Sequence, residues 1–255
     1  MNRPAQPQSL LTQPPVQPRS GRVSIRAHLP RPAPLAIDEE ELRKACPGLG
    51  DTPLTYAREG LKHLSTHMYA GVQGAIPQHH RSQLPDELQV LLSDPISHGS
   101  ICPTHILAIT SSLPSSSSRK YTLFPAHQLV LGAFCASLPH FPSSAAAYPL
   151  PPSSSPSVTL PVVRLALPAP AQFGLLLWYL YVQDAERLRR SLLPAGWDAD
   201  VGGMMQRATV VHGLWANACA LGVVDAQVFE VVQQVWRVVL EAIAKATGAP
   251  MPEES

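Results

Sequence analysis

Proline divides this chain into segments that can form regular structure and segments that cannot. The 255 residues include 28 prolines, about twice an average usage of roughly 5%. Many of them gather in residues 1–37 and in residues 139–156, and the second of these segments is also rich in serine. Because proline fixes φ and lacks an amide hydrogen, it opposes helices and sheet ladders there. We therefore predict two disordered segments, one before the folded part and one within it.

Charge is distributed unevenly between the N-terminal segment and the rest. Residues 1–37 contain five of the 19 Lys and Arg residues and none of the 18 Asp and Glu residues, although the whole chain has a net charge of only +1. The sequence thus predicts a Pro/Arg-rich disordered arm before a mildly acidic body. Such an arm can contact an anionic surface such as nucleic acid. The simpler alternative is a solvated arm without a partner.

Cysteine usage and hydropathy indicate the compartment. The four cysteines lie far apart, and the first 20 residues contain no apolar core of a signal peptide. We therefore expect reduced thiols and an intracellular protein, in the nucleus or the cytoplasm. The longest apolar run, residues 173–182, has about half of the ~20 residues that a membrane-spanning helix needs. We expect a soluble protein with no membrane partner.

Residues 38–84 are predicted to form a helical extension. Within it, residues 52–75 show apolar residues at steps of three and four, which places them on one helical face. Thr52 followed by Pro53 is typical of a helix N-cap and first position. This amphipathic helix packs either on its own domain or on a partner.

Residues 85–248 are predicted to form one domain, and residues 249–255 a short tail. Two β-rich runs, residues 105–110 and 120–124, predict a hairpin. A helix over residues 126–138 precedes the predicted disordered loop 139–156, and a buried strand over residues 158–167 follows it.

Helices are predicted for most of the remaining chain. Residues 171–181 are apolar nearly all round, which is typical of a helix buried on several sides. A short helix follows over residues 184–193. Residues 204–221 and 225–247 predict an antiparallel helical hairpin, with Asp225 as the N-cap of its second helix.

No motif of a phosphate-binding loop, a dinucleotide site, a nucleophile elbow or a zinc helix is present. We therefore predict no catalytic, cofactor-binding or metal-binding residues and no enzymatic activity. Three His and Cys pairs have spacings found in metal sites, although none supplies four ligands. They are His63 with His67, His79 with His80, and Cys102 with His105. Solvated histidines are the simpler interpretation.

Cysteine and tryptophan in the helical stretches are expected to belong to the core. Cys135 and Cys219 lie in apolar surroundings, where cysteine packs as a small hydrophobic residue. Trp178, Trp215 and Trp236 lie on predicted helices, and their indole N–H groups need partners there.

The middle of the chain resembles a BTB/POZ domain. That family has a hairpin, a Phe-x-x-His-x-x-Val-Leu motif at the start of a helix and a later Phe-x-x-Leu-Leu-x-x-x-Tyr motif, which residues 124–131 and 173–181 match in order. The resemblance implies an α+β fold with a small sheet covered by helices, and Leu131 and Leu176 in one core. An aspartate that many members use for dimerisation is replaced here by Thr104 or His105, so a homodimer is left open.

The chain is also similar to the clampless family of basidiomycete fungi. The similarity rests on Pro103-Thr104-His105, on Phe124-Pro125-Ala126-His127 and on the run from His212 to Asn217. It implies a non-catalytic regulator of clamp-cell formation and sexual development that acts through protein partners, including transcription factors.

Two elements are predicted to contact a partner: the helix over residues 52–75 and the exposed face of the final helix. One alternative is a nucleic-acid accessory protein that binds through the arm. Salt-dependent DNA binding that is lost when residues 1–37 are deleted would indicate it. The other alternative is an enzyme of unrecognised type.

Overall fold

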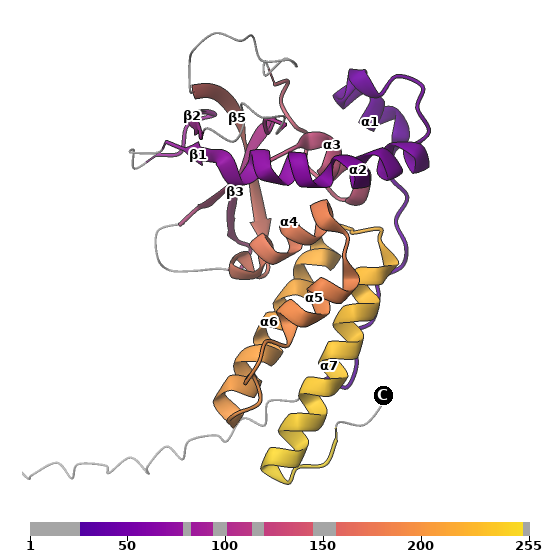
Figure 1. Cartoon of the computed structure of the whole chain (residues 1–255), viewed down its shortest axis with the longest axis vertical. Helices are drawn as coiled ribbons and strands as arrows, with labels where there is room; N and C mark the ends of the chain where they lie inside the picture. The colour runs from indigo at the N-terminus through magenta and orange to yellow at the C-terminus, as the bar shows by residue number, and fades with distance from the viewer. Residues whose placement is uncertain (1–25, 79–82, 94–100, 114–119, 145–156, 252–255) are drawn as a thin grey trace, which may run out of the picture.

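The computed structural model describes residues 26–78, 83–93, 101–113, 120–144 and 157–251. Figure 1 shows a curved sheet with helices at one end of the molecule and two long, adjacent helices at the other. The prediction of an α+β fold is therefore confirmed.

The sheet has five strands in the order β1-β2-β5-β3-β4. They are β1 (Ala75–Pro77), β2 (Glu87–Leu92), β3 (His105–Ser111), β4 (Thr122–Ala126) and β5 (Ser157–Leu167). β3 and β4 form the predicted antiparallel hairpin. β1 lies inside the predicted helical extension and was missed because three residues are too few to show an alternating pattern.

β5 belongs to two ladders. Its residues 157–161 pair antiparallel with β2, and its residues 162–167 pair parallel with β3. Pro161 stands where the partner changes, so its missing amide hydrogen interrupts neither ladder in the middle. The change of partner lets one long strand hold both halves of the sheet.

Alternate residues of β3 enter two different cores. Leu107 and Ile109 belong to the main core beneath the helices, whereas Ile106 and Ala108 belong to a second cluster formed by residues of the strands. β1 contacts β4 although they lie at opposite ends of the strand order. The sheet thus curls over the second cluster, and the expectation of a sheet covered by helices holds for one face only.

Every helix that the periodicity predicts is present. The helices are α1 (Glu39–Ala45), α2 (Leu54–Gly74), α3 (Gln128–Phe134), α4 (Phe173–Val182), α5 (Ala185–Leu192), α6 (Val201–Ala220) and α7 (Ala226–Thr247). The predicted N-cap of α2 is wrong, because Pro53 occupies that position and no side chain caps the helix. Asp225 caps α7 as predicted, with its carboxylate accepting a hydrogen bond from the Gln227 amide.

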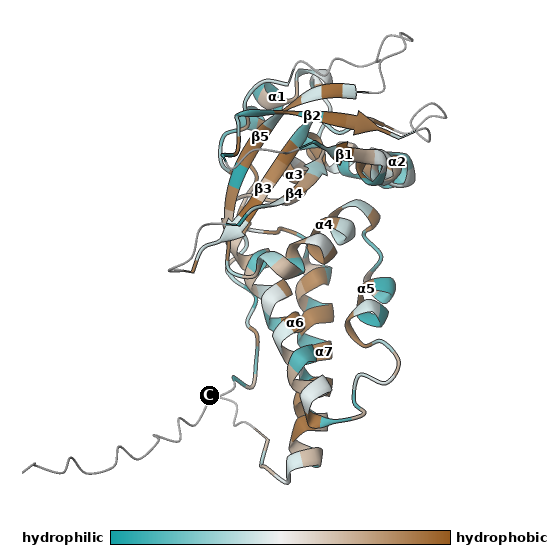
Figure 2. Ribbon diagram, turned by 90° about the vertical axis from the view of Figure 1, so that its left-hand side faces the viewer, coloured by the Kyte–Doolittle hydropathy of each residue, from teal (hydrophilic) through white to brown (hydrophobic). Residues whose placement is uncertain are grey.

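α4 joins the two ends of the molecule. It contacts α2 and α3 on one side and α6 on the other, and its buried residues are Phe173, Leu176, Leu177, Tyr179, Leu180 and Tyr181. Leu131 of α3 and Leu176 of α4 are fully buried in the same core, so the predicted shared interior is confirmed. In Figure 2 hydrophobic residues colour the strands and parts of α6 and α7, whereas α5 is largely hydrophilic.

The turn between α6 and α7 is held by the end of α3. The amides of Ala136 and Ser137 donate to the carbonyls of Gly222 and Leu221, both at 3.0 Å. Gly222 has φ of 60°, a conformation that glycine adopts without the steric cost of a side chain. These bonds fix the helical hairpin to the sheet-containing part.

Two predictions of disorder are wrong over part of their length. Residues 26–37 and 139–144 pack on the body: Leu29 and Phe141 are buried, and Nε2 of His105 lies 2.8 Å from the Pro142 carbonyl oxygen. Proline excludes regular secondary structure from these segments, but it does not prevent side-chain burial or bonds from other side chains to the main chain. Residues 1–25 and 145–156 lie outside the described residues.

α2 packs on its own domain, against α3, α4 and β4. Its Gly71 lies directly beneath Ile101, and a Cβ atom at this position would overlap the Ile101 carbonyl oxygen. Ile101 is itself fixed, since its amide donates to the His67 carbonyl at 3.1 Å and its carbonyl oxygen lies 3.2 Å from Nε2 of His127. Only glycine permits this approach of helix and loop.

The substitution Gly71→Ala should destabilise the protein by about 2 kcal/mol, because backbone must move to admit the methyl group. Urea denaturation measures the change. The control is Gly60→Ala on the same helix, where no atom lies within 4 Å of the added Cβ. It should be neutral or stabilise by up to about 1 kcal/mol. Equal effects of the two substitutions would contradict the role of Gly71.

Candidate functional site

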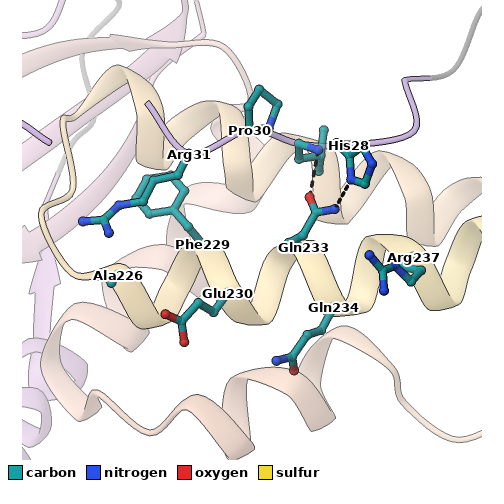
Figure 3. A pocket seen from close by; sticks show the side chains of 10 residues that line it. His28, Pro30, Arg31, Ala226, Phe229, Glu230, Gln233, Gln234 and Arg237 are labelled. Atoms are coloured by element: carbon teal, nitrogen blue, oxygen red, sulfur yellow. Dashed lines mark hydrogen bonds between the residues drawn. The ribbon is translucent and has the colours of Figure 1, made fainter. Parts of the chain in front are cut away.

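An extended segment, residues 26–31, lies along α6 and α7 (Figures 1 and 3). We call it the strap. The indole N–H groups of Trp236 and Trp215 donate to the carbonyls of Arg26 and Pro30, both at 3.0 Å. The two helices therefore bind the main chain of the strap at both of its ends.

Gln233 of α7 binds the middle of the strap through both ends of its amide. Its Oε1 accepts from the Leu29 amide at 2.9 Å, and its Nε2 donates to Nδ1 of His28 at 2.7 Å (Figure 3). One side chain thus satisfies a main-chain donor and a side-chain acceptor of neighbouring residues.

Two side chains of the strap contribute to the binding. Leu29 is 2% exposed and belongs to the main core. The guanidinium of Arg31 lies 5.9 Å from the centre of the Phe229 ring and donates to the Val224 carbonyl at 3.2 Å. An apolar anchor and a cation above an aromatic ring therefore complete the site.

The run from His212 to Asn217 on α6 has one face near the strap and another that packs on Ala169. The His212 ring lies 5.3 Å from the Trp215 ring and 6.3 Å from the Trp236 ring, so it lies close to both strap-binding indoles. Asn217 faces the other way: its Nδ2 donates to the Ala169 carbonyl at 2.7 Å and its Oδ1 accepts from the Ala169 amide at 3.0 Å.

Gly213 allows that second contact to form. A Cβ atom there would lie 2.9 Å from Cβ of Ala169 and 2.8 Å from Oε1 of Gln172. The run that carries the resemblance to the clampless family therefore serves packing on one face and strap binding on the other.

An open groove of about 500 Å³ lies between the strap and α7. Besides the strap residues from His28 to Arg31, its lining is Ala226, Phe229, Glu230, Gln233, Gln234 and Arg237. Glu230 and Arg237 are exposed and carry opposite charges (Figure 3). This is the exposed face of the final helix on which we predicted partner contact.

The start of α7, where the groove begins, is fixed to α4. The hydroxyl of Tyr179 donates to Oδ2 of Asp225 at 2.6 Å, while Oδ1 of the same carboxylate caps α7. Burial and this carboxylate raise the pKa of Tyr179, so its hydroxyl stays protonated as the donor. The groove is therefore built on a rigid junction.

Buried titratable groups belong to the core and not to the groove. Burial raises the pKa of Cys46 and of Cys102 to about 11 and that of Cys135 to about 12. A thiol with such a pKa is protonated at neutral pH and a poor nucleophile. His127 accepts at Nδ1 from the Tyr181 hydroxyl at 2.8 Å, and burial lowers its pKa to about 4.

The residues considered for metal binding are not brought together. His63 and His67 are exposed on α2, while both ring nitrogens of His105 lie within 2.9 Å of protein oxygens, those of Thr104 and Pro142. His79 and His80 lie outside the described residues. Over the described ranges no group of three or more His, Cys, Asp or Glu side chains is arranged to hold a metal ion. Nor does any helix among these residues have both the length and the apolar character to cross a membrane.

Fold and site together define an α+β protein whose closing helical hairpin binds an extended segment of its own chain. A family model described as the Clampless protein 1 N-terminal domain matches residues 30–168, and one described as the Clampless protein 1 C-terminal domain matches residues 182–255. The chain belongs to this clampless family. No curated protein and no solved structure matches it.

Sequence reasoning found the final helix but missed the strap as part of the site. The sequence carries no signal for it, because the burial of Leu29 and the stacking of Arg31 arise only from residues far along the chain. The first family match begins at residue 30, inside the strap.

Acidification should destabilise the protein through His127. Its folded-state pKa of about 4 lies below the ordinary value of 6.5, so between these values the unfolded state binds more protons. Stability is therefore lost as the pH falls through this window, by up to about 3 kcal/mol. The pKa of His105 is also lowered by burial and acts in the same direction.

Urea denaturation at about pH 7 and about pH 4.5 measures this loss. The variant His127→Gln should be less stable at neutral pH, because it loses the bond to Tyr181, but it should lose less stability on acidification. Exposed His63→Gln is the control and should keep the full loss. An unchanged pH dependence in His127→Gln would contradict the assignment.

Proposed function

We propose that this chain is a non-catalytic protein-interaction module that acts as a regulatory adaptor in fungal clamp formation and sexual development. The observation that carries the proposal is the strap site with its adjoining groove. The site already binds an extended peptide through Trp215, Gln233 and Trp236, and the charged groove beside it lies open. Aromatic residues and open, mixed-polarity grooves are typical of protein interfaces.

The biological setting comes from the family. Clampless protein 1, by its name, concerns the clamp cell, and both of its domains are matched here in order. The resemblance described above extends this to basidiomycete sexual development and to transcription factors among the protein partners. We carry both to this chain as part of the proposal.

We also infer that the fold is BTB/POZ-like. Hairpin β3–β4, helix α3 directly after His127, buried helix α4 and closing hairpin α6–α7 follow the order that the resemblance implies. Strands β1 and β2 are additions to that order.

Catalysis has less support than binding. The thiols of Cys46, Cys102 and Cys135 are held protonated by burial. Nucleic-acid binding through the arm also has less support, because Arg31, one of its five arginines, is stacked on Phe229 and bonded to a carbonyl.

The test returns variants of this protein to a clamp-forming fungus that lacks it and counts the clamp cells that form. Glu230→Arg reverses an exposed charge in the groove and should weaken partner binding about tenfold or more, so few clamp cells should form. Arg237→Glu should act in the same way. Neither change should alter stability by more than about 0.5 kcal/mol, because both side chains are exposed.

The matched control is Glu241→Arg, which makes the same exchange at an exposed position of the same helix, outside the groove lining. It should restore clamp cells fully. If all three variants restore clamp cells fully, the groove has no part in the proposed function.

A further inference from the structure

We propose that the surface beneath the strap is a peptide-recognition site, which the strap occupies in the resting protein and which an extended Leu-x-Arg segment of a partner protein takes over. The proposal rests on the proposed function as an interaction module and names the chemistry of its partner.

The contacts to the strap are those of peptide recognition rather than of an ordinary loop. Trp215, Gln233 and Trp236 bind two carbonyls and one amide of the strap main chain, which any extended peptide presents. Pro30 fits because its carbonyl is the acceptor and its missing amide hydrogen is not used. Main-chain contacts of this kind give affinity, and side-chain pockets add the sequence preference.

Two strap side chains define that preference. Leu29 is buried in the main core, and Arg31, two residues later, lies above Phe229 and donates to the Val224 carbonyl. Leucine and arginine separated by one residue are therefore the chemistry that a competing segment must present. The residue between them contributes only its carbonyl, so proline is suitable there but not required.

The strap can leave without taking an element of the fold with it. Its hydrogen bonds described above are all made with side chains of α6 and α7 or by the Arg31 side chain, and none belongs to a sheet ladder. Residues 32–36, which follow the strap on the way to α1, are exposed. Strap and body are thus joined by a short, solvent-facing connection on which the strap can swing away.

A partner segment has to displace a tethered competitor. The short connection over residues 32–36 contains Pro32 and Pro34, which stiffen it, and so it keeps the strap close to its site at a high effective concentration. A free peptide of equal intrinsic affinity therefore binds poorly, and a natural partner needs a second contact. The groove with Glu230 and Arg237 lies beside the strap and supplies one.

A fluorescent peptide with the sequence of residues 26–34 tests the site on the full-length chain. Leu29→Asp places a charge in the buried position and should release the strap in cis. This variant should bind the peptide roughly ten- to a hundredfold more tightly than the unchanged chain, whose own strap competes. Fluorescence anisotropy measures both affinities.

Two controls tie the binding to the site. The same peptide with aspartate in place of leucine should not bind. Adding Gln233→Ala to the Leu29→Asp chain removes the bonds to the strap amide and imidazole, and it should weaken peptide binding about tenfold. A folded Leu29→Asp chain that does not bind the peptide would overturn the proposal.

A second variant decides the matter if Leu29→Asp does not fold. A protease site replacing residues 33–35 allows the strap to be cut from the folded, full-length protein. The cut strap should dissociate on dilution, and the labelled peptide should then bind to the remaining folded chain. Unfolding after the strap has left would show a structural role only and would overturn the proposal.

Failure of this inference differs from failure of the proposed function. If the released chain binds no peptide while Glu230→Arg still prevents clamp cells, partners use the groove without replacing the strap. If the peptide binds but Glu230→Arg, Arg237→Glu and Leu29→Asp all support normal clamp formation, the proposed function is wrong.

Discussion

The structure depends on the burial of α4. This helix is apolar on nearly every side, and six of its ten residues are buried, so it is stable only when other elements surround it. The sheet-bearing part with α2 and α3 covers one side, and the α6–α7 hairpin covers another. The first family match ends at residue 168, before this helix, and the second begins at residue 182, the last residue of the helix.

The bonds around α4 turn this packing into a positioned site. Tyr179 holds the carboxylate that caps α7, and the end of α3 holds the turn that begins at Leu221. Trp215, Gln233 and Trp236 consequently project toward the strap from two helices that are fixed where α6 ends and α7 begins. A binding surface on regular elements keeps its geometry better than one on loops.

Local periodicity was sufficient to predict the helices, because their apolar residues recur over their own length, whereas the β3–β4 hairpin and strand β5 were predicted from their composition. It also led us to propose the exposed face of α7 as a partner surface. It could not predict the strap, since the bonds that fix Arg26 and Leu29 come from residues more than 200 positions away. β1 was missed because it is too short to show a pattern. The contact of Gly71 with Ile101 was missed because it joins two segments that are separated in the sequence.

The bond between Arg26 and Trp236 spans 210 positions in the chain, and this has a consequence for biosynthesis. Translation produces the strap well before α7, so the strap has no complete docking surface until α7 has left the ribosome. During that interval its Leu29-Pro30-Arg31 segment is open to chaperones and to other nascent chains. Docking of the strap therefore has to follow the synthesis and packing of a helix that is made much later.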